Sequence, residues 1–367
     1  MSYILHICSW FPHEGDPQNG VFIRQHIELT LDSFQPIIIC NTPKSKKQIA
    51  SNNIVVFNLN SSASKWSKIR TAKKIFQDLL KEKGQPKAIH LHVASPLGII
   101  ALLATKTFNC KLMITEHWTG YRSGLFSKAP AVQKIITKQL FKKASIIMVV
   151  SKSLKDDLLN LQLTKEEKII VTPNPISLLE ENIPLNTKDS SKINMLSVAD
   201  FNEQNKNFIG ILIAFEKAIT TLPKLHWTII GDGPDKITFE KILNSSSAKN
   251  HVTLLGRKPQ AYVLQHYSEY DFLVSFSRFE TFAMVPAEAI ASGIPVIATK
   301  SGGPEHYINN ENGILIESDN SEQLLHAIKT LSITFTEYSS EQLRNSLPSA
   351  FSPSHFTKTL TKLYNKE

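Results

Sequence analysis

The chain has 367 residues and only three cysteines, none of them close to another in sequence. Cys8, Cys40 and Cys110 form no Cys-x-x-Cys pair, so the sequence suggests neither a zinc ribbon nor a disulfide framework. We expect all three to be reduced thiols packed inside the protein.

Long apolar segments are also lacking. Crossing a bilayer takes roughly 20 apolar residues, and the longest candidate here is the short run Leu97 to Ala104. The N-terminus carries no charged leader or cleavage site. The composition therefore predicts a cytoplasmic globular protein, and the chain is long enough for two domains of common size.

Negative charge is scarce in the first half of the chain. Residues 1–179 hold 24 Lys and Arg against 11 Asp and Glu, whereas residues 180–367 hold 17 against 21. The basic half suits an anionic membrane surface, which would make the protein peripheral on the inner face of the membrane, or a polyanionic acceptor. Nucleic acid is the weakest of the candidate partners, because no zinc-finger, RRM or helix-turn-helix pattern accompanies the charge.

Part of this charge lies on a predicted amphipathic helix, residues 65–83. Most of its cations fall on one face of the helix. Its apolar residues fall near the opposite face: Trp66, Ile69, Phe76, Leu79 and Leu80. A helix packed on the domain core with a solvated lysine face is the commoner explanation, and insertion into a membrane is the alternative. A second basic stretch, 122–143, favours a basic surface on this half.

Short β-rich apolar runs alternate with amphipathic helical patterns along both halves. This alternation predicts parallel sheets with crossover helices, an α/β chain of two Rossmann-like, doubly wound domains with a ligand cleft between their carboxyl-end loops. The polar stretch after Thr172-Pro173-Asn174-Pro175 predicts a linker. We predict an N-terminal domain at 1–175, a linker at 176–192, a C-terminal domain at 193–350 and a terminal helical segment at 351–367.

The stretch 278–298 is the most informative of the sequence. It sets Glu280 and Glu288 eight positions apart, with Pro286 suited to the first turn of a helix and Gly293 to its end. One carboxylate is thus expected on a loop and the other on a helix. Backbone N–H groups at the start of that helix would attract an anion, and the carboxylates would accept hydrogen bonds from hydroxyls.

This stretch resembles the donor-binding motif of the retaining glycosyltransferases of family 4 (glycosyl transferases group 1), which have the GT-B fold. The resemblance implies that Glu280 contacts the hydroxyls of the donor sugar and Glu288 those of the ribose. It also implies a donor-binding role for the residues around them: Arg278, Thr281, Phe282, Ala283 and Met284. A terminal helix that returns to the first domain is a further property of GT-B enzymes.

Weaker matches follow elsewhere. Ser9-Trp10-Phe11-Pro12 with Gly20 resembles the first loop of the family, where a glycine lets the backbone approach the donor phosphate. Thr115-Glu116-His117 resembles a segment whose histidine lies beside the transferred sugar, which implies a catalytic role for His117. Gly231 and Gly233 resemble a turn near the nucleotide.

The main departure from the family is Asp200, which stands where an arginine usually grips the diphosphate. Lys206 matches the accompanying lysine with a shift of one residue. A carboxylate at Asp200 would repel a diphosphate unless it turns away or meets a cation. Arg257 and Arg278 are the candidate substitutes.

No metal site is expected. His90 and His92 bracket Leu91 on a predicted strand, and we expect their side chains to point to opposite faces, where they could not chelate one ion together.

Taken with the resemblance, these features predict a metal-independent, retaining hexosyltransferase without a cofactor. It would use a UDP- or GDP-linked sugar and a glycan or lipid-linked acceptor, as in polysaccharide or lipopolysaccharide biosynthesis. The family's front-face mechanism would place Lys206 on the leaving diphosphate. Two alternatives are a nucleotide-sugar epimerase of the same fold and a non-catalytic binder of sugar nucleotides or glycans.

Overall fold

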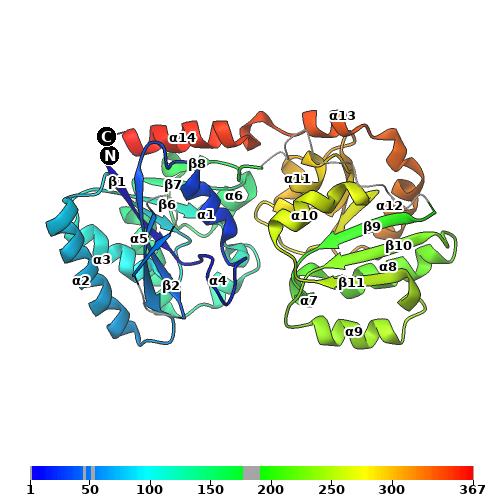
Figure 1. Ribbon diagram of the computed structural model, residues 1–367, viewed down its shortest axis with the longest axis horizontal. Helices are drawn as coiled ribbons and strands as arrows, with labels where there is room; N and C mark the ends of the chain where they lie inside the picture. The colour runs from blue at the N-terminus through cyan, green and yellow to red at the C-terminus, as the bar shows by residue number, and fades with distance from the viewer. Residues whose placement is uncertain (1, 44–46, 51–53, 177–190, 367) are drawn as a thin grey trace. The chain divides into compact units, whose positions relative to one another are not determined.

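The protein is described here from a computed structural model that covers residues 2–43, 47–50, 54–176 and 191–366 (Figure 1). The chain divides into two compact units. Unit 1 comprises Met1–Pro175 and Ser352–Glu367, and unit 2 comprises Ile176–Phe351. Most of the expected linker, 176–192, lies outside the described residues.

Unit 1 is built on a sheet with the strand order β3-β4-β2-β1-β5-β6-β7-β8. All pairings are parallel except that of β3 with β4. The antiparallel β3 was not predicted from the sequence. The strands are β1 Tyr3–Cys8, β2 Gln35–Thr42, β3 Lys47–Ala50, β4 Ile54–Asn60, β5 Ala88–His92, β6 Lys111–Glu116, β7 Ile146–Val149 and β8 Ile169–Val171.

Helices cover both faces of this sheet. On one face α2 contacts α3, and α3 contacts α5. On the other, α1 and α14 pack on side chains of the even-numbered β1 residues. The helices of unit 1 are α1 Val21–Glu28, α2 Lys65–Lys83, α3 Gly98–Thr107, α4 Leu125–Lys128, α5 Ala131–Lys143, α6 Lys152–Asn160 and α14 Pro353–Asn365.

Helix α14, red in Figure 1, joins unit 1 although it is the last helix of the chain. Ser352 caps its start by accepting a hydrogen bond from the N–H of His355, and Pro353 occupies the first turn. One side of α14 is buried against Ile4, Met113 and Met148 of the sheet. The buried residues of the helix are Phe356, Leu360, Leu363 and Tyr364. Unit 1 therefore needs this distant segment to complete its core.

Unit 2 has a fully parallel sheet with the order β11-β10-β9-β12-β13-β14. Its strands are β9 Ile193–Val198, β10 Leu225–Ile230, β11 Val252–Gly256, β12 Phe272–Ser275, β13 Val296–Thr299 and β14 Gly313–Ile316. Its helices are α7 Glu203–Lys206, α8 Phe208–Ile219, α9 Lys236–Asn244, α10 Gln260–His266, α11 Met284–Ala291, α12 Ser321–Thr334 and α13 Ser340–Asn345.

The core of unit 2 is aromatic on the face covered by α8, α9 and α12. Trp227 of β10 is fully buried there against Phe208, Phe215 and Phe239. The two sheets confirm the predicted doubly wound α/β architecture. In both, the loops that follow the carboxyl ends of the strands carry the candidate site residues, as parallel sheets require.

The structure also describes the three cysteines and the apolar character of the helices. Cys8 and Cys40 are buried free thiols on neighbouring strands, and Cys110 is a partly buried free thiol. Within the described part of the chain, no helix combines the length and the apolar character needed to span a membrane.

Candidate functional site

The centre of the candidate site in unit 2 is an ion pair between Lys206 and Glu280. Lys206 is the last residue of α7, and its Nζ lies 2.5 Å from Oε1 of Glu280, in the loop that follows β12. Both side chains are largely covered but remain accessible, with 25% and 13% of their surface exposed. Two residues predicted to hold opposite ends of one ligand, the diphosphate and the sugar, are thus in direct contact in the free protein.

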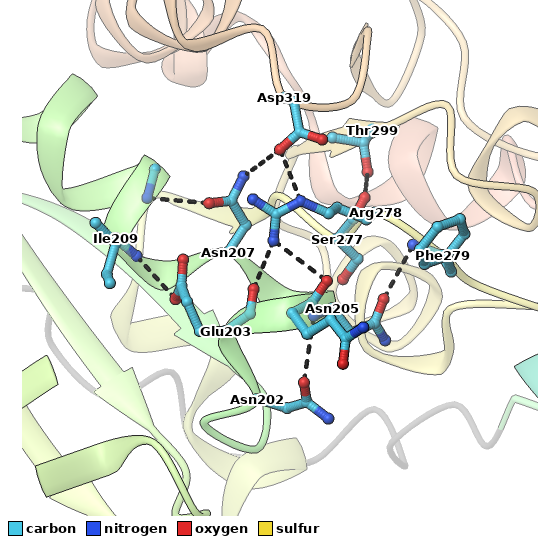
Figure 2. A network of polar contacts seen from close by, with 12 residues as sticks. Asn202, Glu203, Asn205, Asn207, Ile209, Ser277, Arg278, Phe279, Thr299 and Asp319 are labelled. Atoms are coloured by element: carbon cyan, nitrogen blue, oxygen red, sulfur yellow. Dashed lines mark hydrogen bonds and ion pairs between the residues drawn. The ribbon is translucent and has the colours of Figure 1, made fainter. Parts of the chain in front are cut away.

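Arg278 fixes the two loops that carry this ion pair (Figure 2). Its Nη1 donates to the carbonyl oxygens of Glu203 and Gln204 in α7, at 2.5 and 3.2 Å, and its Nε donates to Asp319 at 2.8 Å. Its backbone N–H donates to the carbonyl oxygen of Asn205. Three donor groups of Arg278 thus position these loops in the free protein, and its contact with the donor stays a prediction.

Asparagine side chains complete this network. Asn207 adopts a left-handed conformation with φ of 53°, caps α8 by accepting from the N–H of Gly210, and donates to Asp319. Asn205 accepts from the N–H of Phe279 through its side chain. Neither residue was predicted to have this role, because the loops that they join are distant in sequence: Phe279 lies 74 residues from Asn205, and Asp319 lies 112 residues from Asn207.

Replacing Arg278 with alanine should loosen α7 from the Glu280 loop while leaving unit 2 folded. We expect catalytic turnover to fall about tenfold or more, since displacement of site residues by about 1 Å is costly. Arg278→Lys should rescue little, because an ammonium cannot reproduce the forked contacts. Steady-state kinetics together with thermal unfolding tests this. Turnover near the wild-type value in Arg278→Ala would contradict the positioning role.

Glu288 lies in a different environment from Glu280. It is buried on α11, where Gln260 donates to its Oε1 at 2.6 Å and Tyr267 donates to its Oε2 at 3.2 Å. Burial raises the pKa of Glu288 to about 7, and the two hydrogen bonds offset only part of that effect. Gln260 and Tyr267 were not predicted. The structure does not place Glu288 in contact with Lys206 or Glu280.

The segment before α11 is held by backbone contacts. Ala283 has a left-handed backbone, with φ of 64°, and its carbonyl oxygen accepts from the hydroxyl of Tyr307. A Cβ at Gly303 would lie 2.4 Å from the carbonyl carbon of Phe282, so only glycine allows this close approach. No side chain caps the start of α11, which suits the predicted anion contact at Thr281 to Met284.

Asp200 meets a cation. Its Oδ1 lies 2.9 Å from Nη2 of Arg257, which follows β11. Because sequence alone left open whether the carboxylate would face a cation, this contact answers the main objection to an anion site here.

Gly231 and Gly233 bring the turn after β10 close to the loop after β9. A Cβ at Gly231 would lie 1.8 Å from the carbonyl oxygen of Ala199, and one at Gly233 would lie 2.6 Å from that of Phe201. The backbone N–H of Phe201 donates to Asp232 across this contact. Backbone packing at the carboxyl edge of the sheet therefore requires both glycines. Their contact with a nucleotide is a separate prediction.

The predicted residues of unit 1 also lie near one another. Gly20 precedes α1 with φ of 67°, and a Cβ there would come within 2.8 Å of the Trp10 backbone. His117 follows β6 and is buried, with its ring 4.5 Å from that of Phe22. Burial and the nearby His26 hold the pKa of His117 well below its usual value, so its imidazole is neutral at pH 7.

Glu116 is an organising residue that the sequence analysis quoted but did not assign. It is fully buried and accepts four hydrogen bonds: from the N–H groups of Ala94, His117 and Trp118 and from the hydroxyl of Tyr121. The carboxylate thereby ties the loop after β5 to the loop after β6. The position of this carboxylate at the end of a buried strand was the feature of the sequence that could have indicated its role.

The expectation that His90 and His92 point to opposite faces was wrong. Side chains two residues apart on a strand share a face, and the two rings stack with centroids 4.0 Å apart. With His6 of β1 they form a buried group of three whose nitrogens lie within 4.8 Å. However, both nitrogens of His90 are hydrogen-bonded, to Tyr364 and Thr115 at 2.6 Å, and stacked rings do not aim their lone pairs at one point. A neutral hydrogen-bonded array explains the group better than a metal site.

The family model "Glycosyl transferases group 1" matches residues 180–334, and the model "Glycosyltransferase Family 4" matches residues 27–178. The chain is 27% identical over 266 residues to an alpha-monoglucosyldiacylglycerol synthase of Acholeplasma laidlawii, covering 65% of each protein, slightly less than two thirds of that relative's length. It is 29% identical over 333 residues to an uncharacterised glycosyltransferase of Methanocaldococcus jannaschii, covering 89% of this chain and 83% of that protein.

A third relative is the N-acetylgalactosamine-N,N'-diacetylbacillosaminyl-diphospho-undecaprenol 4-alpha-N-acetylgalactosaminyltransferase of Campylobacter jejuni, 28% identical over 241 residues and 63% of each protein.

Solved structures share the fold at low sequence identity. A sucrose-phosphate synthase from Thermosynechococcus elongatus superposes with a TM-score of 0.81 at 17% identity, covering 99% of this chain and 98% of that one. HepE of Anabaena, solved in complex with UDP, gives 0.76 at 15% identity, covering 98% and 99%. With the two family models matching in succession along most of the sequence, the chain belongs to the family 4 glycosyltransferases (glycosyl transferases group 1) and has their GT-B fold.

Proposed function

We propose that this protein is a retaining hexosyltransferase that moves a sugar from a UDP- or GDP-linked donor to a glycan or lipid-linked acceptor. The observation that supports the proposal is a pair of carboxylates in unit 2 whose surroundings differ. Glu280 is ion-paired with Lys206 near the surface, and Glu288 is buried with hydrogen bonds from Gln260 and Tyr267. Glu280 suits a site where charge develops during the reaction, and Glu288 suits the binding of a pair of ribose hydroxyls.

In the mechanism we propose, Lys206 exchanges its partner during the reaction. Arrival of the donor draws the ammonium from Glu280 to the diphosphate, where it stabilises the charge on the leaving group. Glu280 is then free to accept hydrogen bonds from the sugar. It positions the sugar and does not attack it, so no covalent intermediate is needed.

Backbone N–H groups at the start of α11 would supply further contacts to the diphosphate, in place of a metal ion. The contact of Gly20 with the donor phosphate stays a prediction from the sequence. His117, as a neutral imidazole, can form a hydrogen bond with a sugar hydroxyl without adding a positive charge.

The contact of Asp200 with Arg257 bears on the alternative of a non-catalytic binder. That alternative was motivated by the carboxylate of Asp200, which stands where the family usually has an arginine. An adjacent guanidinium offsets the charge, so the observation favours an intact donor site over a disabled one.

For the acceptor, two relatives point to lipids by their names: one is a synthase of monoglucosyldiacylglycerol, and the other acts on a diphospho-undecaprenol glycan. We propose an acceptor of this class, a lipid-linked or surface glycan, met by a cytoplasmic enzyme at the inner face of a membrane.

Donor binding should depend on pH through Glu288. In the free protein its pKa is about 7, and ribose hydroxyls donate more strongly to the ionised carboxylate. Donor affinity should therefore be constant well above pH 7 and fall up to about tenfold per pH unit below it. Calorimetric titration with UDP- and GDP-sugars in EDTA, from pH 6 to 8, tests this, since these donors have no group that titrates in that range.

Variants separate Glu288 from other sources of pH dependence. Glu288→Gln should weaken binding about tenfold or more and abolish the dependence, whereas Glu322→Gln, on the exposed side of α12, should change neither. Equal donor affinity in the wild type and Glu288→Ala would refute the assigned donor site.

A further inference from the structure

Two apolar hollows open on the face of unit 1 formed by α2, α3 and α5. The first, of about 390 Å³, lies at the start of α3 and is lined mainly by apolar side chains, including Leu97, Ile99, Ile100 and Ile136. The second, of about 460 Å³, continues along α3, with Ile99, Leu102 and Leu103 in its lining. Because Ile99 borders both, the hollows adjoin and follow one helix. We call this surface the α2–α3–α5 face.

The rim of the α2–α3–α5 face is cationic. Five lysines take part in the lining of the two hollows: Lys65, Lys68, Lys73, Lys106 and Lys143. None of the residues described as lining either hollow is an aspartate or a glutamate. The three helices together carry twelve Lys and Arg against two carboxylates, Asp78 and Glu82. The positive charge of the first half of the chain is thus concentrated here.

Large apolar side chains project from the same helices. Trp66, at the start of α2, has 78% of its surface exposed, and Val132 and Ile135 of α5 have 59% and 54%. Val132 and Lys65 line the same hollow, and Trp66 and Ile135 belong to the same two helices, α2 and α5. Further along α2, Phe76 and Leu79 are buried in the core. The helix is therefore an ordinary domain helix over its second half and presents apolar surface outward at its start.

We propose that the α2–α3–α5 face binds the surface of a bilayer containing anionic phospholipid. Lysines at the rim would meet lipid phosphates, because an anionic bilayer surface attracts nearby cations. Trp66, Val132 and Ile135 would enter the interfacial region, where an indole is favoured, and the hollows would receive acyl-chain segments.

A soluble polyanion is the competing ligand for a basic surface. Such a ligand would use the cations but would leave the hollows and the three exposed apolar side chains in contact with water. The combination of an apolar floor, projecting apolar side chains and a lysine rim therefore favours a lipid surface. The inference stands apart from the transfer reaction, because it concerns binding to lipid and needs no donor.

Flotation of the full chain with vesicles tests the proposal. We expect binding to vesicles in which about one third of the phosphatidylcholine is replaced by phosphatidylglycerol, and weak binding to phosphatidylcholine alone. Substituting Lys65, Lys68 and Lys73 with Gln should weaken binding to the anionic vesicles at least about tenfold. The matched control removes the same charge from unit 2, as Lys217, Lys224 and Lys249→Gln, and should bind like the wild type.

The apolar contribution needs its own pair of variants. Val132→Ser with Ile135→Ser should reduce vesicle binding severalfold, whereas Ile237→Ser with Ile333→Ser should not, although those side chains of unit 2 are 67% and 72% exposed. Brominated lipid should quench the fluorescence of the wild type and quench that of Trp66→Phe much less.

Equal vesicle binding by the two lysine variants would overturn the proposal. So would binding to a soluble polyanion, such as polyphosphate, with no binding to anionic vesicles. Because donor affinity is measured separately, loss of vesicle binding with retained donor binding would leave the proposed transfer reaction intact.

Discussion

Replacing Lys206 with methionine is expected to lower catalytic turnover by a factor of about 100 to 1,000. The substitution keeps the length of the side chain and removes the positive charge that is ion-paired with Glu280. In the proposed mechanism that charge moves to the leaving diphosphate, so its loss acts on the transition state more than on the bound donor. The fall should therefore appear chiefly in kcat, with a smaller change in donor affinity.

A second variant distinguishes charge stabilisation from positioning. If Lys206 only holds Glu280 in place, Lys206→Met combined with Glu280→Gln should be no slower than Glu280→Gln alone. If Lys206 stabilises the leaving group, the double variant should be slower than either single one. Lys217→Met, on the exposed side of α8, provides the matched control. A kcat of Lys206→Met within about threefold of the wild-type value would contradict the proposed role.

Local patterns in the sequence were sufficient to predict the fold class. The alternation of short apolar runs with amphipathic ones predicted two doubly wound parallel sheets, because each element reports its own period. Glu280 and Glu288 were placed correctly on a loop and a helix for the same reason: the flanking strand, Pro286 and Gly293 all lie nearby. The antiparallel β3 at a sheet edge had no such pattern.

Contacts between distant segments could not be predicted. The roles of Arg278, Asn205 and Asp319 depend on hydrogen bonds that join three loops far apart in sequence. The pairing of Asp200 with Arg257 depends on which loops meet at the edge of the sheet. In these cases the residue types are visible in the sequence, and only the three-dimensional arrangement determines their partners.

The buried histidines show a different kind of failure. Their strand was predicted, but applying the two-residue period wrongly separated His90 from His92 and hid the array they form with His6. Correct use of the period would have placed both on one face. It would not have revealed His26 and His117, which come from α1 and from the loop after β6.

These histidines should make unit 1 unfold in mild acid. Burial lowers the pKa of His6 and of His26 to about 3, and it holds the pKa values of His90, His92 and His117 well below the ordinary value. In the unfolded chain all five take up protons below about pH 6.5. The unfolded state then binds more protons than the folded state, so stability falls as the pH drops below 6.5.

The expected size of this effect is large. For each histidine whose pKa falls from 6.5 to 3 on folding, the free energy of unfolding decreases by about 2 kcal/mol between neutral pH and pH 5. His6 and His26 together give about 4 kcal/mol, a large part of the whole stability of a domain. The lowered pKa values of His90, His92 and His117 add to the loss in the same direction. Burial raises the pKa of Glu116, which offsets part of the loss, but this is one carboxyl group against five imidazoles. In unit 2 the raised pKa of Glu288 acts in the opposite direction and stabilises that unit in acid.

The two units should therefore respond differently to acid, and hydrogen exchange can measure each of them. On going from pH 7.5 to pH 5, after correction for the intrinsic exchange rate, amides of β1 and β5 should lose protection while those of β9 and β10 retain it. His26→Phe, which keeps an aromatic ring against Phe22 and Phe356, should reduce the acid sensitivity of unit 1. His326→Gln on the exposed side of α12 should leave it unchanged. Equal protection of β1 and β5 at the two pH values would show that these imidazoles gain protons without unfolding the sheet, and would contradict their burial as neutral groups.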